Sequence, residues 1–141
     1  MARLVRFLIA GWWGSLTTIG FVVVPLLFVY LETPAMAGQM AAKLFEAQTW
    51  ITLFCGLMYL LAQRRMHGGA PASPSMAVLA ALLSSLLLEL AVKPHIVARD
   101  NLMLWHNLGS ALYVLQWLCV SSLLWQGSKE KATDAVADSE A

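Results

Sequence analysis

Charged residues are scarce in this sequence. Only 12% of its 141 residues are Asp, Glu, Lys or Arg, whereas 60% are hydrophobic. A soluble domain usually carries about a quarter charged residues, because its surface must stay hydrated. This scarcity excludes an ordinary soluble domain, and a chain of this length has no room for a separate soluble catalytic domain. We therefore expect a protein that works in or at a membrane, with the lipid bilayer as its first partner.

Several signals of known chemistry are also missing. The net charge is only +1, without a large basic cluster, so nucleic acid is not expected as a partner. The two cysteines, Cys55 and Cys119, lie inside apolar runs without CxxC spacing, which favours buried thiols. The chain contains no glycine-rich phosphate loop, nucleophile elbow or c-type haem attachment motif. These absences disfavour an enzyme.

What the sequence does contain is four long hydrophobic runs, at residues 7–31, 44–62, 76–92 and 103–125. About 20 apolar residues suffice to cross a bilayer as a helix. The runs lack the alternation of barrel strands, so they predict an all-α, integral membrane four-helix bundle within residues 1–126. Breaks are expected at Thr33-Pro34, at residues 68–71 and at Lys93-Pro94, and Pro25 is expected to kink the first helix.

The two ends of the chain need separate interpretation. Arg3 and Arg6 followed by an apolar run could begin a signal peptide, with Ala35-Met36-Ala37 as its cleavage site. The run is longer than the core of a signal peptide, so we interpret it as the first span. Residues 127–141 are polar and end in acidic residues, which predicts a disordered cytoplasmic tail.

The distribution of basic residues predicts the orientation. Cytoplasmic loops are enriched in Lys and Arg. Lys43, Lys93 and Arg99 lie on one side of the predicted topology, and the other six basic residues lie on the opposite side. Both termini are therefore predicted to be cytoplasmic. The six are Arg3, Arg6, Arg64, Arg65, Lys129 and Lys131.

Ionisable residues near the hydrocarbon gather at the predicted outer ends of the helices. An acidic residue within a span is a functional candidate by default, although an ion pair between Glu89 and Lys93, four residues apart, is an ordinary structural explanation. His106 fits either an interfacial belt or a role as ligand or proton carrier. The candidate ligand-binding cluster comprises Lys43, Glu46, Glu89, Lys93 and His106.

Small and polar residues recur at helical spacing within three of the runs. Such stripes usually mark helix–helix contacts in membranes, and the alternative is a cavity that opens outward. The stripe in the first run is Gly11, Gly14, Ser15, Thr18 and Pro25. That in the second is Glu46, Thr49, Thr52, Gly56, Tyr59 and Gln63. That in the fourth is His106, Ser110, Tyr113 and Trp117.

Four short segments, taken in order, resemble the transmembrane protein 205-like family, whose bacterial members are membrane proteins with a domain of unknown function. The resemblance covers about residues 5–125 and implies four helices, a bacterial inner-membrane location and no established activity. It places Lys43 with Phe45 at the start of the second helix, and His106 with Ser110 at the start of the fourth. The segments are Gly20–Phe28, Gly38–Phe45, Lys93–His95 and Trp105–Ser110.

A more distant similarity concerns residues 20–30, which look like a segment of membrane protoporphyrinogen oxidases and of copper-resistance D-type proteins. Those families use a histidine in the first helix, and this chain has none before His67. Only His106 would be suitably placed as an axial haem ligand. His95, His106, Glu46 and Glu89 are suitable metal-ligand types, but their spacing matches no known metal motif. Haem and metal ions are therefore not the favoured cofactors.

The sequence leads to one main functional hypothesis and two alternatives. The main hypothesis is a non-enzymatic, multi-pass membrane protein that binds a small ligand or ion, or is associated with transport, through the outer polar cluster. The alternatives are a haem- or metal-dependent membrane redox protein with His106 as ligand, and an assembly subunit of a membrane complex. Partners beyond the bilayer would be a second copy of the chain, since four helices form a small bundle, or another membrane protein.

Overall fold

A computed structural model describes the backbone of residues 2–66 and 75–139, and the side chains of residues 3–66 and 75–126. The elements described are all helical, which confirms the all-α prediction. In chain order they are α1 (Ala2–Thr17), η1 (Thr18–Val23), α2 (Val24–Tyr30), α3 (Pro34–Met66), α4 (Met76–Leu87), η2 (Leu88–Val92), α5 (Lys93–Ala98) and α6 (Leu102–Ser139), where η denotes a π-helix.

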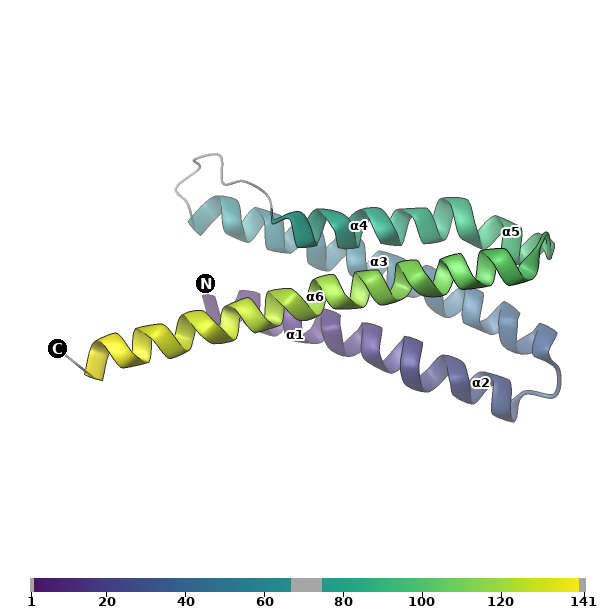
Figure 1. Cartoon of the computed structure of the whole chain (residues 1–141), viewed down its shortest axis with the longest axis horizontal. Helices are drawn as coiled ribbons and strands as arrows, with labels where there is room; N and C mark the ends of the chain where they lie inside the picture. Colours follow the sequence, from purple (N-terminus) through teal and green to yellow (C-terminus); the bar gives the residue numbers. More distant parts are fainter. Residues whose placement is uncertain (1, 67–74, 140–141) are drawn as a thin grey trace.

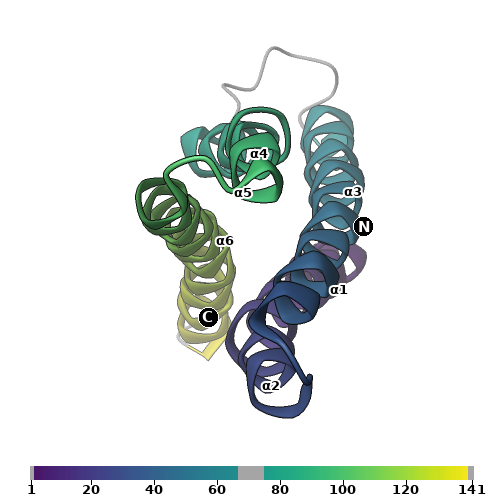
Figure 2. The ribbon, with the colours of Figure 1, turned by 90° about the vertical axis from the view of Figure 1, so that its right-hand side faces the viewer.

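These elements combine into four helical segments that are long and apolar enough to cross a membrane: Arg3–Tyr30, Pro34–Met66, Met76–Ala98 and Leu102–Gln126. The predicted number of spans is therefore confirmed by length and composition. The segments form a bundle in which α1 and α4 each pack against both α3 and α6 (Figures 1 and 2).

The bundle has two distinct ends. We call the end with the turns at residues 31–33 and 99–101 the hairpin end, and the end where α1 begins and α3 finishes the terminal end (Figure 1). The apolar core is concentrated in the terminal half, because its members come from the first parts of α1 and α4 and the later parts of α3 and α6. The buried residues of this core are Ile9, Trp12, Leu16, Cys55, Tyr59, Val78, Ala81, Tyr113, Val120 and Leu123.

Proline accounts for both π-helices. It lacks an N–H group, and its ring clashes with the carbonyl four residues earlier. The helix accommodates this by widening just before the proline. Ahead of Pro25, the Val24 N–H bonds to the carbonyl of Ile19, five residues back. Ahead of Pro94, the Lys93 N–H bonds likewise to Leu88. Pro25 thus interrupts the first span as predicted, by means of a π segment.

The predicted helix boundaries differ from the observed ones in two places. The prediction that the third helix stops at Lys93-Pro94 was wrong, because η2 absorbs the proline and α5 continues to Ala98. The second helix was predicted from residue 44 but begins at Pro34, since proline suits the first turn of a helix, where its missing N–H has no partner to lose. The predicted break at residues 68–71 lies outside the described residues.

The backbone of α6 continues to Ser139, where the sequence predicted a disordered tail from residue 127. Residues such as Ala, Lys and Glu in this segment are good helix formers. The preceding span also supplies a formed helix, so extending it avoids the cost of nucleation.

Candidate functional site

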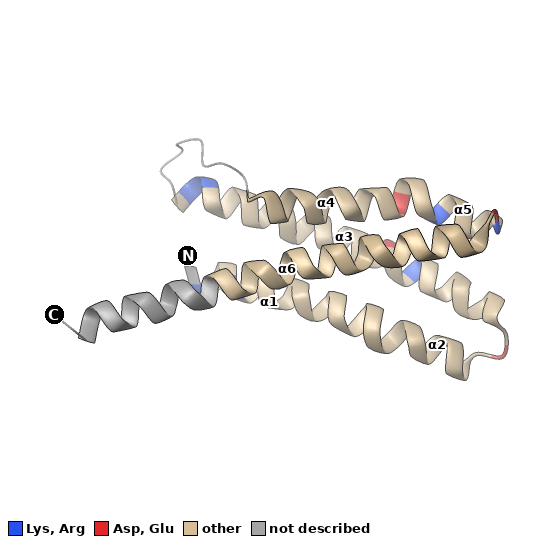
Figure 3. Ribbon diagram, in the orientation of Figure 1, with Lys and Arg blue, Asp and Glu red and all other residues tan. Residues whose placement is uncertain are grey.

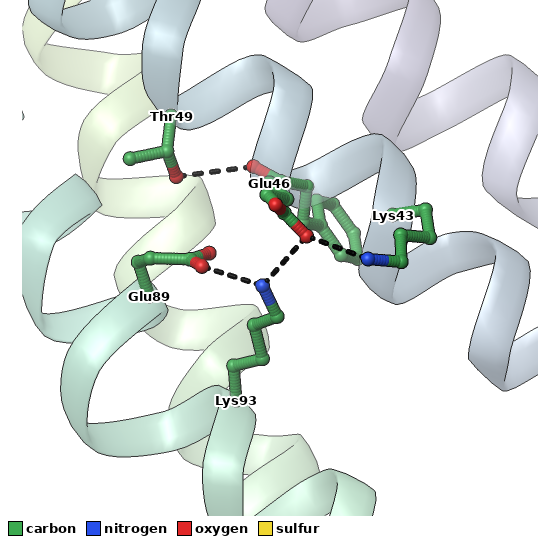
Figure 4. A network of polar contacts seen from close by, with 6 residues as sticks. Lys43, Glu46, Thr49, Glu89 and Lys93 are labelled. Carbon is green, nitrogen blue, oxygen red and sulfur yellow. Dashed lines mark hydrogen bonds and ion pairs between the residues drawn. The ribbon is translucent and has the colours of Figure 1, made fainter.

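Four of the five predicted cluster residues meet near the hairpin end (Figure 4). Lys93 lies at the centre. Its Nζ is 2.9 Å from Glu46 Oε2 and 2.5 Å from Glu89 Oε1. Lys43 Nζ contacts the same Glu46 oxygen at 3.2 Å. The site is therefore a chain of two ammonium groups and two carboxylates, which we call the charge network.

Two different spans position the charge network. Lys43 and Glu46 lie on consecutive turns of α3, whereas Glu89 lies in η2 and Lys93 is the first residue of α5. The predicted pair between Glu89 and Lys93 is confirmed. The Glu46–Lys93 contact was not predicted, because it joins residues far apart in the sequence and depends on how α3 packs against the third span. This contact ties the third span to α3.

The members of the network differ in exposure. The side chains of Glu89 and Lys93 are 24% and 25% exposed, and that of Glu46 is 37% exposed. Lys43 is 76% exposed and forms the rim. Charges that are partly removed from water interact more strongly than on an open surface, because the surrounding dielectric constant is lower. The two positive and two negative charges balance, which makes the partial burial tolerable.

Neighbouring side chains support the Glu46 end of the network. Thr49 Oγ1 donates a hydrogen bond of 3.0 Å to the carbonyl oxygen of Phe45, one turn before it (Figure 4). The Phe45 ring contacts that of Tyr113 on α6 edge-to-face, with centroids 5.2 Å apart. Glu46 therefore lies next to a residue, Phe45, whose ring connects this turn of α3 to Tyr113 of α6.

His106, the fifth predicted residue, lies outside the charge network. It is exposed near the start of α6, and among the described residues it has no hydrogen bond or ion pair. His106 lies two helical turns before the buried Tyr113 and therefore on a similar side of α6, but in the first turns of that helix it is exposed. Another histidine, His95, makes two contacts with described residues. Its ring stacks on Trp105 with centroids 4.0 Å apart, and its Nδ1 is 3.4 Å from Asp100 Oδ2.

The structure confirms the predicted stripe on α3 as a packing face and contradicts the glycines of the stripe on α1. On α3, Thr49, Thr52, Gly56 and Tyr59 are buried, as expected for a packing face. On α1, the glycine stripe was wrong. A Cβ at Gly11 or Gly14 would meet nothing within 4 Å, and the buried positions are Ile9, Trp12 and Leu16. Large apolar side chains therefore set that interface.

A second, uncharged polar cluster lies near the middle of the bundle and was not predicted. Thr52 is fully buried. Its Oγ1 accepts hydrogen bonds from donors on three helices: Trp12 Nε1 of α1 at 3.1 Å, Gln48 Nε2 of α3 at 3.4 Å and Gln116 Nε2 of α6 at 2.7 Å. Gln48 Nε2 also donates to Ser15 Oγ at 3.1 Å, while Gln48 Oε1 has no partner among the described residues. Glutamines at positions 48 and 116, inside apolar runs, were the available signal.

Two tryptophans join α1 to α6 in a reciprocal way. Trp13 Nε1 donates to Ser121 Oγ at 2.9 Å, and Trp117 Nε1 donates to Thr17 Oγ1 at 2.9 Å. Each hydroxyl in turn donates to the carbonyl of the tryptophan one turn before it in its own helix. The indole rings themselves approach to 6.1 Å. These contacts fix the two helices in the terminal half, next to the apolar core.

Side chains that could bind a metal ion are dispersed in the described part of the chain. Within residues 3–66 and 75–126, whose side chains the structure describes, no three His, Cys, Asp or Glu side chains gather as a metal site would need. Cys55 and Cys119 are free thiols, in keeping with the sequence interpretation. The charge network is therefore the main candidate site, and its chemistry is ion pairing.

Four apolar helices around a partly buried charge network define a multi-pass membrane protein. Comparison with known families identifies the family of this chain. Residues 7–104 match the family described as domain of unknown function DUF4149, and the chain belongs to that family. The match covers the first three spans and the start of α6, and therefore all four members of the charge network. No curated protein and no solved structure matches the chain.

Proposed function

We propose that this protein binds a small cationic ligand or ion at the charge network, in association with transport across a bacterial inner membrane. The observation that carries the proposal is the position of Lys93 Nζ between the carboxylates of Glu46 and Glu89. In this arrangement a lysine ammonium occupies a site that two carboxylates from different spans create. A ligand ammonium group or a metal cation has the charge needed to compete for the same oxygens.

The location of the network favours binding over a purely structural role. A surface ion pair contributes little to stability, and a buried one often contributes no more than apolar packing would. Stability alone therefore gives little reason to keep four charges at the edge of a hydrophobic bundle, which favours a role in binding. In the proposed topology both termini are cytoplasmic, so the hairpin end and the network face outward. This proposal includes the kinship with the transmembrane protein 205-like family.

Ligand-dependent stabilisation tests the proposal. The purified protein in lipid nanodiscs would be heated with NaCl, KCl, MgCl2, methylammonium or choline, while its tryptophan fluorescence is followed. A ligand that binds only the folded state stabilises it by about 2.7 kcal/mol at one hundred times its dissociation constant. We expect at least one cation to raise the melting temperature of the wild type.

Matched variants locate the effect. Glu46→Gln and Glu89→Gln should abolish the cation-dependent shift, whereas Glu32→Gln, a carboxylate at the same end but outside the network, should retain it. His106→Ala should also retain the shift, because His106 lies outside the network. The proposal fails if no cation stabilises the wild type more than it stabilises the Glu46→Gln variant.

A further inference from the structure

The four spans form two units of the same build. In each unit an interrupted helix runs to the hairpin end, and a long unbroken helix returns from it (Figure 1). The first unit is α1–η1–α2 followed by α3, and the second is α4–η2–α5 followed by α6. In both, the π segment ends two residues before a proline, at Val23 before Pro25 and at Val92 before Pro94.

The two interrupted helices also share their packing register. When Pro25 is aligned with Pro94, the buried positions of α1 coincide with buried positions of α4. The coincident pairs are Ile9 with Val78, Trp12 with Ala81, and Leu16 with Ser85. The same face of each helix is therefore used against the rest of the bundle. Interruptions at corresponding positions of two repeated units are typical of the helices that form the binding sites of membrane transporters.

In the interrupted helix of the first unit, buried residues are no longer found from the start of η1, and in that of the second unit, from the end of η2. None of the residues of η1, α2 and α5, all of which the structure describes, is buried. In α2, Leu26, Phe28, Val29 and Tyr30 are exposed. Figure 1 shows α2 diverging from α6 toward the hairpin end, and the contacts of α2 are chiefly with α3. Beyond the prolines, α2 is held by contacts with α3, and α5 by contacts with α6 that include the stack of His95 on Trp105, but no residue of either segment is buried.

A side chain from the second unit holds the first interruption open. The Tyr113 hydroxyl donates a hydrogen bond of 2.8 Å to the carbonyl oxygen of Leu16, and the Tyr113 ring lies against Gly20. In a regular α-helix that carbonyl would accept a hydrogen bond from the N–H of Gly20, four residues later. A Cβ at Gly20 would overlap the Tyr113 ring. The hydroxyl is thus inserted into the helix ladder, which is a recognised cause of bending.

The second interruption carries the charge network. In the alignment of the two prolines, Glu89 occupies the position of Gly20, so both residues lie in the π segment of their unit. Lys93, just beyond η2, reaches Glu46 on α3. This ion pair is the polar contact that fastens α5 to the unbroken helix of the other unit.

We infer that α2 and α5 are two gates, which swing about η1 and η2 while the terminal half stays packed. Their movement opens and closes the hairpin end around the charge network. Ten residues of helix beyond Gly20 span about 15 Å. A swing of about 20° therefore displaces the tip of α2 by about 5 Å. The inference rests on packing and backbone geometry, and so it does not require the proposed cation site to be correct.

Distance measurements between spin labels test this inference. In full-length protein with Cys55 and Cys119 replaced by serine, one label pair would be placed at the exposed gate positions Val29 and Val97. A control pair would be placed at the exposed terminal-half positions Leu4 and Met76. Double electron–electron resonance in nanodiscs then reports both distance distributions. We expect the distance distribution of the gate pair to be broader than that of the control pair by about 5 Å or more.

Proline replacement shows whether the π segments are the hinges. The double variant Pro25→Ala/Pro94→Ala should narrow the gate distribution and leave the control pair unchanged, which also verifies folding. If the control pair changes, the single variants Pro25→Ala and Pro94→Ala are compared by the same measure, and narrowing in either supports the inference. The inference would be overturned if the wild-type distance distribution of the gate pair were as narrow as that of the control pair. It would also be overturned if the proline variants left the width of the gate-pair distribution unaltered.

Discussion

The two halves of the bundle are built differently. The terminal half contains most of the apolar core, with regular α-helices and paired tryptophans that join α1 to α6. The hairpin half contains both π segments and the charge network (Figure 3). The buried Thr52 cluster lies between them. The difference teaches that one half of this small protein provides most of the cohesion, whereas the other half carries the charge network and the irregular helices.

Removing the Thr52 hydroxyl should have the largest effect on stability. Thr52→Val keeps the shape of the side chain but leaves the donors of Trp12 and Gln116 without their acceptor, while Gln48 keeps its bond to Ser15. We expect the free energy of unfolding to fall by about 2–4 kcal/mol, measured by steric trapping in bicelles. The matched change Thr18→Val, at an exposed threonine, should cost less than about 0.5 kcal/mol. Equal costs at the two positions would show that the buried cluster does not stabilise the bundle.

Filling the close approach between η1 and α6 should have the next largest effect. Gly20→Ala places a methyl group against the Tyr113 ring, and overpacking of this kind costs about 1–3 kcal/mol. Gly14→Ala is the control, because a Cβ there meets nothing within 4 Å. That substitution should be neutral or slightly stabilising, since alanine is the better helix former. Unfolding measurements in which Gly14→Ala is the more harmful change would contradict this packing.

The smallest of these effects is expected for the lysines of the charge network. Lys93→Met leaves two partly buried carboxylates close together and should cost about 1–2 kcal/mol. Lys43→Met removes only a contact at the exposed rim and should cost less than about 0.5 kcal/mol. Thermal unfolding of both variants checks the order. Finding that Lys43→Met costs as much as Lys93→Met would remove the distinction between the centre and the rim.

The sequence predicted the cohesive features of the fold better than the irregular ones. Four spans followed from the long apolar runs, because spanning helices must satisfy their backbone groups internally. The Glu89–Lys93 pair followed from its four-residue spacing within one helix. By contrast, Lys93-Pro94 was interpreted as a stop, because a π segment that absorbs a proline leaves no mark in the local residue pattern. Glycines at positions 11 and 14 misled in a similar way, since small residues do not reveal which side of a helix faces its neighbour.

The candidate site shows the same limit. Glu46 and Lys93 were both predicted to lie at the outer ends of their helices, but their contact depends on the rotation of α3 relative to the third span. His106 was included because it lies at the same predicted depth, but it is exposed near the start of α6 and lies outside the network. The position of a residue along its helix can thus be predicted from hydropathy, whereas its orientation around the helix axis requires the packed structure.

The central claim is that the segments beyond the π-helices are less firmly held than the rest of the bundle at the same depth. Amide hydrogen exchange of the protein in nanodiscs tests this most directly, because exchange follows local opening. Residues 34–46 of α3, an unbroken helix at the hairpin end, serve as the depth-matched reference. We predict that peptides from residues 18–30 and 88–98 exchange about tenfold faster than this reference, which corresponds to about 1.4 kcal/mol of local stability. Equal exchange in the three segments would contradict the account.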